Sequence, residues 1–147
     1  MKSLGKKILF ISSPGGHFVE LLDILTSLNP DNFAVVVSGK SSYDKGDIRI
    51  IRAPQADRNL AVFRQFYFAF VCLIKERPKV IISTGAGIAV PFFVYSRILR
   101  IYTIYVETPT AIFKPTFTCR IVRWFSDRLY VRTEMLQSKV KNSIYLT

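Results

Sequence analysis

The sequence is poor in the residues that build metal sites and disulfide frameworks. Its 147 residues include one histidine, His17, and two cysteines, Cys72 and Cys119. One imidazole and two distant thiols do not supply the four ligands of a zinc site, so we expect no metal site, and we expect no cofactor. Cys72 lies in an apolar helical pattern, which predicts a buried, reduced thiol and favours a cytosolic location.

Long uncharged apolar runs are also missing. The nearest candidates are Phe66–Ile74 and Ala86–Ser96, both shorter than the roughly 18 residues that a membrane span needs. The first apolar run, close to the N-terminus, is too short for a signal peptide. We therefore expect one domain over residues 1–147, with only peripheral contact to membranes.

Acidic residues are scarce relative to basic ones. The chain carries 21 lysines and arginines against 10 aspartates and glutamates, which gives a formal net charge of +11. Such a charge predicts attraction to an acidic partner: nucleic acid, an anionic membrane surface or a phosphorylated substrate. Half of the residues are apolar, which predicts a folded chain rather than a disordered one.

Short apolar runs alternate with segments of helical periodicity along the whole chain. This alternation is typical of a parallel sheet with helices on both faces, so the predicted fold class is α/β, a doubly wound sheet in a single domain. The predicted strands are Ile8–Ile11, Phe33–Ser38, Ile48–Arg52 (near an edge), Val80–Thr84, Ile101–Val106 and Arg128–Val131, with Ser143–Leu146 as a candidate for a last one. The predicted helices are one that ends at Leu28, then Leu60–Arg77, Ile88–Leu99 and one that ends at Phe125.

A glycine-rich turn links the first predicted strand to the first predicted helix. The strand stops before Ser13, Gly15 and Gly16 follow, and the helical pattern begins at Phe18. Glycines permit a sharp turn and leave the amides uncovered, and the N-terminus of a helix attracts anions. Ser13, Gly15, Gly16 and His17 therefore form a candidate phosphate site. A plain turn with a solvent-facing imidazole explains the same residues, and this alternative stays open.

Two further candidate spots follow later strands. A second glycine-rich turn contains Thr84, Gly85 and Gly87, and Glu107 with Thr108 follows the fifth predicted strand. Because ligands of doubly wound sheets bind at the carboxyl ends of the strands, we expect all three spots to converge on one crevice. The amides of the second turn would add to the anion site. For the two threonines, a hydroxyl bonded to the local backbone is the favoured interpretation.

The longest helical pattern, Leu60–Arg77, is apolar nearly all round. Such a pattern favours burial on more than one side, between the sheet and neighbouring helices. The alternative is a partly exposed aromatic face that meets lipid or a partner subunit. We favour burial for most of these residues.

Basic residues crowd the second half of the chain. On an anionic membrane, each basic residue near the surface contributes about 1 kcal/mol. The predicted helix that ends at Phe125 interleaves Arg120 and Arg123 with Trp124, as an interfacial helix does, so these three are predicted to face the membrane. A solvated basic face is the alternative. The whole set is Arg97, Arg100, Lys114, Arg120, Arg123, Arg128 and Arg132.

Four blocks of sequence together resemble one known family. They are Ser13–Leu21, Arg77–Gly87 with Pro91, Tyr105–Thr108 and Phe125–Val131. In this order they resemble the membrane-associated, acceptor-side subunit of two-component glycosyltransferases. One branch of that family serves synthesis of dolichol-linked chitobiose, and a bacterial branch serves capsule and exopolysaccharide synthesis. The resemblance covers nearly the whole chain.

The resemblance implies one half of a GT-B glycosyltransferase, whose active site lies between two Rossmann-like domains. This chain would be the N-terminal half, which binds a lipid-linked saccharide at the cytoplasmic face of the membrane. A separate chain would bind the UDP-sugar, so a heterodimer is expected. Two features depart from the family pattern: the eukaryotic branch has an N-terminal membrane helix that is not seen here, and Cys119 stands where a glycine is expected.

Inverting glycosyl transfer needs a base near the acceptor hydroxyl and stabilisation of the departing diphosphate. His17 is one candidate base, because an imidazole titrates near neutral pH. Glu107 is the rival, as a carboxylate at a strand end in the same predicted crevice, and a helix cap or an ion pair is its alternative role. The sequence leaves this choice open.

Two other classes of protein match less well. A dinucleotide-binding enzyme would have Gly-x-Gly-x-x-Gly after the first strand and an acid at the end of the second, where this chain has Ser38 and Gly39. A nucleic-acid-binding module suits the charge, but no helix-turn-helix, zinc or aromatic RNA motif is present, and we expect no nucleic acid partner. A basic peripheral-membrane or nucleic-acid-binding module without transferase activity is the alternative to a glycosyltransferase subunit.

Overall fold

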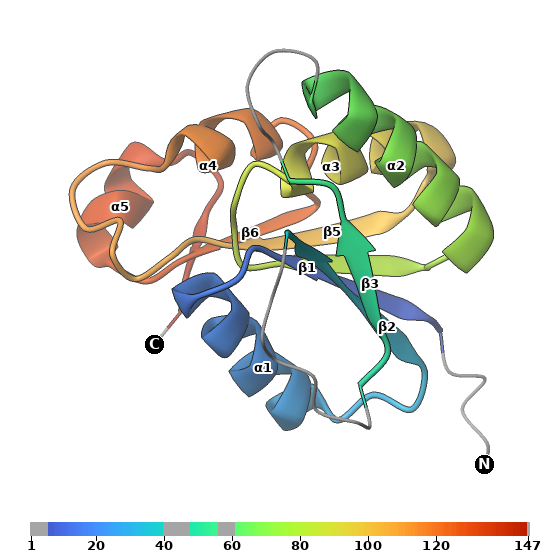
Figure 1. Ribbon diagram of the computed structural model, residues 1–147. Coiled ribbons are helices and arrows are strands. Elements are labelled where there is room, and N and C mark those ends of the chain that lie inside the picture. Colours follow the sequence, from blue (N-terminus) through green and yellow to red (C-terminus); the bar gives the residue numbers. More distant parts are fainter. Residues whose placement is uncertain (1–5, 40–47, 56–60, 147) are drawn as a thin grey trace.

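The computed structural model describes residues 6–39, 48–55 and 61–146 of the chain (Figure 1). Within these residues, seven strands form one sheet in the order β3-β2-β1-β4-β5-β6-β7, and all neighbouring strands run parallel. The order reverses between β1 and β4, which is the switch point at which doubly wound sheets bind ligands. The predicted fold class is confirmed. The strands are β1 (Ile8–Ser12), β2 (Phe33–Ser38), β3 (Ile50–Ala53), β4 (Val80–Ser83), β5 (Tyr102–Val106), β6 (Arg128–Val131) and β7 (Ile144–Tyr145).

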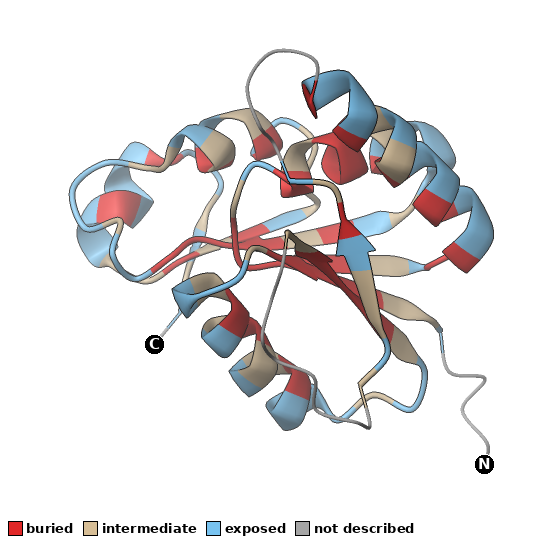
Figure 2. Ribbon diagram, in the orientation of Figure 1, coloured by how far each residue is buried: buried red, intermediate tan, exposed pale blue. Residues whose placement is uncertain are grey.

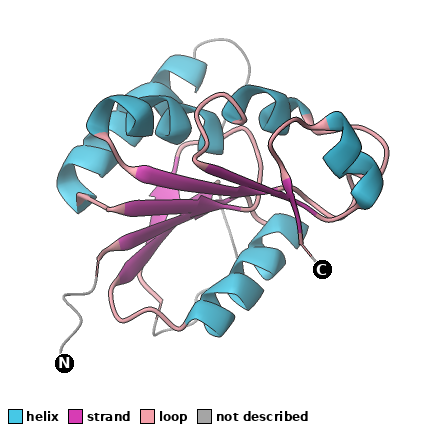
Figure 3. Ribbon diagram, turned by 180° about the vertical axis from the view of Figure 1, so that it is seen from behind, coloured by secondary structure: helices cyan, strands magenta, loops and turns pink. Residues whose placement is uncertain are grey.

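The helices cover the two faces of the sheet unequally. Of the described helices, α1 covers one face, and α2, α3 and α4 form a layer on the other (Figures 1 and 3). Helix α5 contacts β6 and β7 near the C-terminal edge of the sheet. The helices are α1 (Gly16–Leu28), α2 (Ala61–Glu76), α3 (Ala89–Leu99), α4 (Phe117–Val122) and α5 (Glu134–Lys139).

The core is divided by the sheet into two clusters, because successive strand side chains point to opposite faces. On β1, Leu9 and Ile11 belong to the cluster under the three-helix layer, whereas Phe10 packs with Phe18 and Leu21 of α1. Figure 2 shows the central strands as buried along most of their length. The apolar runs of the sequence are therefore strands that are buried on both faces, as their composition predicts.

Several predicted bounds differ from the structure. Helix α4 ends at Val122 rather than Phe125, and the short helix α5 was not predicted. The strand predicted at Ile48–Arg52 occupies Ile50–Ala53 instead and is the edge strand, as expected. Helix α5 has six residues, of which only Leu136 is buried. Its sequence therefore shows no helical repeat of apolar residues.

The prediction that α2 is buried on more than one side is wrong for its outer face. Phe63 and Tyr67 are 74% and 73% exposed, whereas Gln65 and Glu76 are buried on the inner face. An apolar pattern that continues all round a helix does not indicate which side faces the sheet. Leu60, the predicted start of this helix, lies outside the described residues.

Candidate functional site

The three predicted spots lie at one end of the sheet, after three adjacent strands. The turn with His17 follows β1, the turn with Gly85 follows β4, and Glu107 follows β5. Strand β4 pairs with β1 on one side and with β5 on the other. The strands are parallel, so their carboxyl ends share one edge of the sheet, and the three spots lie along that edge.

The first and second turns are joined by two hydrogen bonds between His17 and Thr84. The hydroxyl of Thr84 donates to the backbone oxygen of His17 at 2.7 Å. The Nδ1 atom of His17 lies 3.0 Å from the backbone oxygen of Thr84. A carbonyl oxygen only accepts hydrogen bonds, so Nδ1 carries the proton, and Nε2 of a neutral ring is then an acceptor. The Thr84 hydroxyl thus bonds to the other turn and not to its local backbone, contrary to the favoured interpretation.

Gly85 is required where the two turns meet. Its φ is +136°, and a Cβ at this position would lie 2.8 Å from Cε1 and 2.9 Å from Nδ1 of His17. Both values are shorter than van der Waals contact, and an L-residue with a side chain is strained at such a φ. The second glycine turn therefore makes room for the imidazole ring.

Helix α1 begins beside this contact, and no described side chain caps its first turn. Gly15 precedes it with a φ of +97°, and no atom lies within 4 Å of a Cβ built on Gly15, Gly16 or Gly87. Gly15, Gly16 and Gly87 are exposed and Ser13 is half-buried. No side chain therefore covers these three glycines, which leaves room for a ligand beside the N-terminus of α1.

Glu107 points into the protein rather than into open space. It is fully buried. Its Oε1 accepts from the amide of Thr108 at 3.0 Å, and its Oε2 accepts from the amide of Thr116 at 3.0 Å. The Thr116 hydroxyl lies 3.1 Å and 3.0 Å from these two oxygens and also accepts from the amide of Cys119 in the first turn of α4. The carboxylate thus fixes both ends of the loop that leads from β5 to α4.

This carboxylate also affects its neighbours. Burial raises the pKa of the Cys119 thiol well above its ordinary value, and the charge and hydrogen bond of Glu107 raise it further. Thr108 interacts locally, because its hydroxyl accepts from the backbone amide of Thr110 at 3.4 Å and lies 3.0 Å from the Thr110 hydroxyl, as expected for this threonine. Both cysteines are free and buried, which confirms the prediction for Cys72.

Glu20 and Arg132 also lie in this region, and the sequence did not indicate them as site residues. Glu20 lies on α1 three residues after His17, and Arg132 directly follows β6. The Oε2 atom of Glu20 and the Nε atom of Arg132 are buried, and neither has a hydrogen-bond partner. Burial raises the pKa of Glu20, while the charges of His17 and Arg132 act to lower it. The helical spacing of three from His17 was the signal that could have found Glu20.

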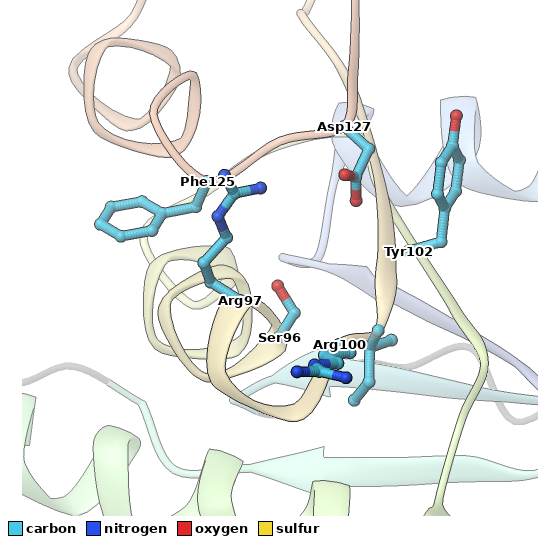
Figure 4. Close-up of a pocket in the computed structure, with 7 residues that line it drawn as sticks. Ser96, Arg97, Arg100, Tyr102, Phe125 and Asp127 are labelled. Atoms are coloured by element: carbon cyan, nitrogen blue, oxygen red, sulfur yellow. The ribbon is translucent and has the colours of Figure 1, made fainter.

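A separate cavity of about 370 Å³ opens at the opposite end of the sheet (Figure 4). It is lined by Arg97 of α3, by Arg100, which directly follows that helix, and by Tyr102, the first residue of β5. Asp127, also on its wall, accepts hydrogen bonds from the amide and hydroxyl of Thr103 at 2.8 and 3.0 Å. This cavity is therefore not part of the candidate site at the carboxyl ends.

The residues predicted to face a membrane lie on or directly after α4. Trp124 is 71% exposed, and the Arg123 guanidinium stacks over its ring at 4.7 Å from the centroid. Arg120 is also exposed. None of the helices in the described ranges combines the length and apolarity that crossing a membrane would require.

The fold places the chain among Rossmann-like domains of the kind found in GT-B glycosyltransferases. It matches MurG of Acinetobacter baumannii with a TM-score of 0.74 at 16% identity, over 88% of this chain and 42% of that one. It matches the UDP-GlcNAc 2-epimerase of Methanocaldococcus jannaschii with a TM-score of 0.69 at 14% identity, over 96% and 45% of the two chains. These likenesses show the fold, and the chain spans less than half the length of these proteins.

The family follows from the sequence comparisons. The model of the family described as "Oligosaccharide biosynthesis protein Alg14 like" matches residues 47–147, and the chain belongs to this family. It is 24% identical over 176 aligned residues to the UDP-N-acetylglucosamine transferase subunit ALG14 of Mus musculus, which covers 95% of this chain and 81% of the mouse protein. The resemblance inferred from the four sequence blocks is confirmed.

Proposed function

We propose that the chain is the acceptor-binding, membrane-recruiting subunit of a two-component GT-B glycosyltransferase. A separate chain would bind the UDP-sugar, and the pair would transfer the sugar to a lipid-linked saccharide at the cytoplasmic face of the plasma membrane. The product would be a polysaccharide such as capsule or exopolysaccharide. The observation that carries the proposal is the pairing of His17 with Thr84 across the switch point of the sheet, in a chain of the Alg14-like family.

The two-component arrangement is supported by the name of the mouse relative. That relative is named as a subunit, and the match covers 81% of it. The donor domain would come from a partner chain, in a heterodimer.

His17 is the proposed general base. Its Nδ1–H donates a hydrogen bond to the backbone oxygen of Thr84, which fixes the orientation of the ring. The lone pair of the neutral ring is then on Nε2. A neutral imidazole in this tautomer accepts the proton of the acceptor hydroxyl as that hydroxyl attacks the anomeric carbon of the UDP-sugar, while the bond from this carbon to the diphosphate breaks and UDP leaves on the partner chain. The amides of Gly15 and Gly16, with that of Gly87, would hold the acceptor diphosphate at the N-terminus of α1. The amide of Gly85, which the sequence also indicated, is buried and donates to the Ser83 hydroxyl at 3.3 Å.

Glu107 is the weaker of the two candidate bases. It is fully buried, and both of its carboxylate oxygens accept hydrogen bonds from Thr116 or Thr108. A base has to reach the proton that it removes. We propose that Glu107 holds the loop between β5 and α4 and thereby fixes the position of Thr108.

Recruitment to the bilayer rests in this proposal on exposed basic and aromatic side chains, with Arg120, Arg123 and Trp124 among them. The formal charge of +11 attracts an anionic surface. Contact with the bilayer would bring the crevice close to the head group of a lipid-linked acceptor.

The test is co-expression with a candidate partner chain and an assay of membranes with UDP-GlcNAc and lipid-linked acceptor. Membranes with both chains should transfer the sugar, and membranes with either chain alone should not. His17→Ala should lower the turnover number about 100-fold or more if the imidazole is the base. Thr26→Ala, at an exposed position on the same helix, is the control.

The outcomes separate the parts of the proposal. If this chain transfers sugar without a partner, the two-component arrangement is wrong. If His17→Ala keeps full activity in the complex, the assignment of the base fails, although the subunit assignment survives. Glu107→Gln should reduce activity in proportion to loss of folded protein, whereas a large loss in turnover by fully folded protein would favour Glu107 as the base.

A further inference from the structure

Helix α2 exposes a row of large apolar side chains on its outer face, while its buried face carries mainly small and polar ones. Phe63, Tyr67, Phe70 and Ile74 follow one another at helical spacing, and their exposed fractions are 74%, 73%, 44% and 48%. We call these four residues the α2 stripe. The inner face of the same helix consists of Ala61, Gln65, Ala69, Cys72, Leu73 and Glu76. A helix whose larger apolar side chains face outward indicates a second apolar surface to cover them.

The exposed charges of the segment that carries the α2 stripe have one sign. Over residues 61–106, all of which the structure describes, the only acidic residue is Glu76. It is buried and pairs with Lys7 and Arg49. All basic residues of this segment are exposed: Arg64, Lys75, Arg77, Lys79, Arg97 and Arg100. A surface that combines exposed aromatics with cations and lacks exposed acids fits an anionic lipid bilayer.

The α2 stripe begins at the same end of the sheet as the candidate site. A groove between α2 and the segment after β3 is lined by Ala53, Pro54, Phe63 and Tyr67. The side chain of Gln65 donates to the backbone oxygen of Pro54 at 3.3 Å, which fixes this end of the helix to the carboxyl end of β3. A bilayer in contact with the α2 stripe would therefore lie beside the crevice end of the sheet.

We propose that the α2 stripe, with its flanking basic residues, is the surface by which the chain lies on an anionic bilayer. This inference rests on the proposed function and makes it more specific, because it assigns the main contact to α2 rather than to α4. The four residues span about 17 Å along the helix, as eleven steps of 1.5 Å do. Such a helix lies in the plane of the interface with its apolar face among the lipid head groups.

The experiment measures sedimentation of the purified full chain with vesicles of phosphatidylcholine, with and without phosphatidylglycerol. The double variant Phe63→Ser/Tyr67→Ser should bind the anionic vesicles about tenfold more weakly or worse, because each aromatic ring buries an area of about 150–250 Å² when it is covered. Leu28→Ser, at a 53% exposed position on α1 across the sheet, is the control and should bind like the wild type. Trp124→Ser tests the α4 surface separately.

A second readout locates the contact directly. Trp124 is the only tryptophan, so Tyr67→Trp in a Trp124→Phe background places a single fluorophore on the α2 stripe. Its emission should shift to the blue with anionic vesicles, and brominated lipids should quench it. Both substitutions are at exposed positions, so the melting temperature of the free chain should stay unchanged.

The assignment would be overturned if the wild type did not bind anionic vesicles, or if the double variant bound them as well as the wild type. It would also be overturned if the double variant bound vesicles normally but no longer formed a complex with the partner chain. The last result would identify the α2 stripe as a protein interface. None of these depends on transferase activity. Failure of the proposed function would instead appear as vesicle binding without sugar transfer in the co-expression assay.

Discussion

At the scale of single residues, the contact between His17 and Gly85 is the most constrained feature of the candidate site. Gly85→Ala places a Cβ at 2.8 Å from the imidazole and at a φ of +136°. We expect it to lower the free energy of unfolding by about 1–3 kcal/mol, because the clash and the backbone strain act together. Urea unfolding of the purified chain measures this loss.

A double-mutant cycle separates the two causes. In a His17→Ala background the clash is removed and only the backbone strain remains, so Gly85→Ala should cost clearly less than in the wild type. Gly87→Ala is the matched control, since no atom lies within 4 Å of the point that its Cβ would occupy. Additive costs of Gly85→Ala and His17→Ala would mean that the close approach of the ring is not what requires the glycine.

Glu20 should make the stability of the chain depend on pH. Burial holds the pKa of its carboxyl above the ordinary value of 4.5, against the charges of His17 and Arg132. Because the pKa is raised in the folded state, the free energy of unfolding is highest below the unfolded pKa. It falls as the pH rises through the folded pKa. Glu20→Gln should therefore be more stable than the wild type at pH 7.

The measurement is thermal unfolding of Glu20→Gln and wild type between pH 4 and pH 8. The gain in melting temperature should shrink as the pH falls through the raised pKa of the folded state, because the wild-type carboxyl then becomes protonated in the folded protein. Asp31→Asn, at an exposed position after the same helix, controls for a general change of charge. A gain that is constant across the range would contradict the assignment to Glu20.

Single residues also show what the sequence could and could not predict. The glycine turn, His17 and the strand-end position of Glu107 were visible as residue types at strand boundaries. The hydrogen bonds between His17 and Thr84 join residues 67 positions apart, and no local pattern encodes such a pair. The inward direction of Glu107 depends on Thr116, which belongs to a loop whose path the sequence does not reveal.

At the scale of elements, one buried carboxylate ties three segments together. Glu76, at the end of α2, pairs with Lys7 before β1 and accepts two hydrogen bonds from Arg49 before β3, at 2.7 and 2.9 Å. Its side chain is 3% exposed, whereas that of Arg49 is 55% exposed. The solvent around Arg49 screens part of the attraction.

Glu76→Gln should lower the free energy of unfolding by about 1–2 kcal/mol at pH 7, after allowance for that screening. Burial acts to raise the pKa of Glu76, but hydrogen bonds and charges from Lys7 and Arg49 outweigh it and leave the pKa below 4.5. With a lowered folded pKa, the stabilisation is present above the unfolded pKa and is lost as the pH falls through the folded one. Chemical unfolding at pH 7 and in acid should show the difference shrinking in acid. A difference that persists in acid would point to lost packing rather than to lost ion pairs.

Elements differ in how well the sequence predicts them. The buried strands β1, β2 and β4 were predictable because apolar runs of four to six residues between turn residues fit little else. The orientation of α2 was not predictable, because apolar residues all round a helix do not indicate which of its faces packs against the sheet. Helix α5 depends on a cap, in which Thr133 accepts from the amide of Leu136 at 3.2 Å, and such a cap gives a weak signal without an apolar face.

At the scale of the whole molecule, two different surfaces would serve two different partners. The candidate site at the carboxyl ends of the strands is polar and borders the N-terminus of α1, whereas the α2 stripe is apolar and belongs to a helix of the layer on the other face of the sheet (Figures 1 and 3). In a GT-B enzyme the second domain faces the crevice. The donor subunit and the bilayer should therefore bind without competing for the same side chains.

Hydroxyl-radical footprinting tests this division, because His17 and Tyr67 both carry oxidisable rings. The partner chain should slow oxidation of His17 several-fold, since an interface core excludes water, and should leave Tyr67 unchanged. Anionic vesicles should do the reverse, because they cover the α2 stripe and leave the crevice open. Met135, an exposed residue of α5, reports general changes in radical dose. Protection of Tyr67 by the partner in the absence of vesicles would mean that one surface serves both partners, and α2 would then belong to the subunit interface.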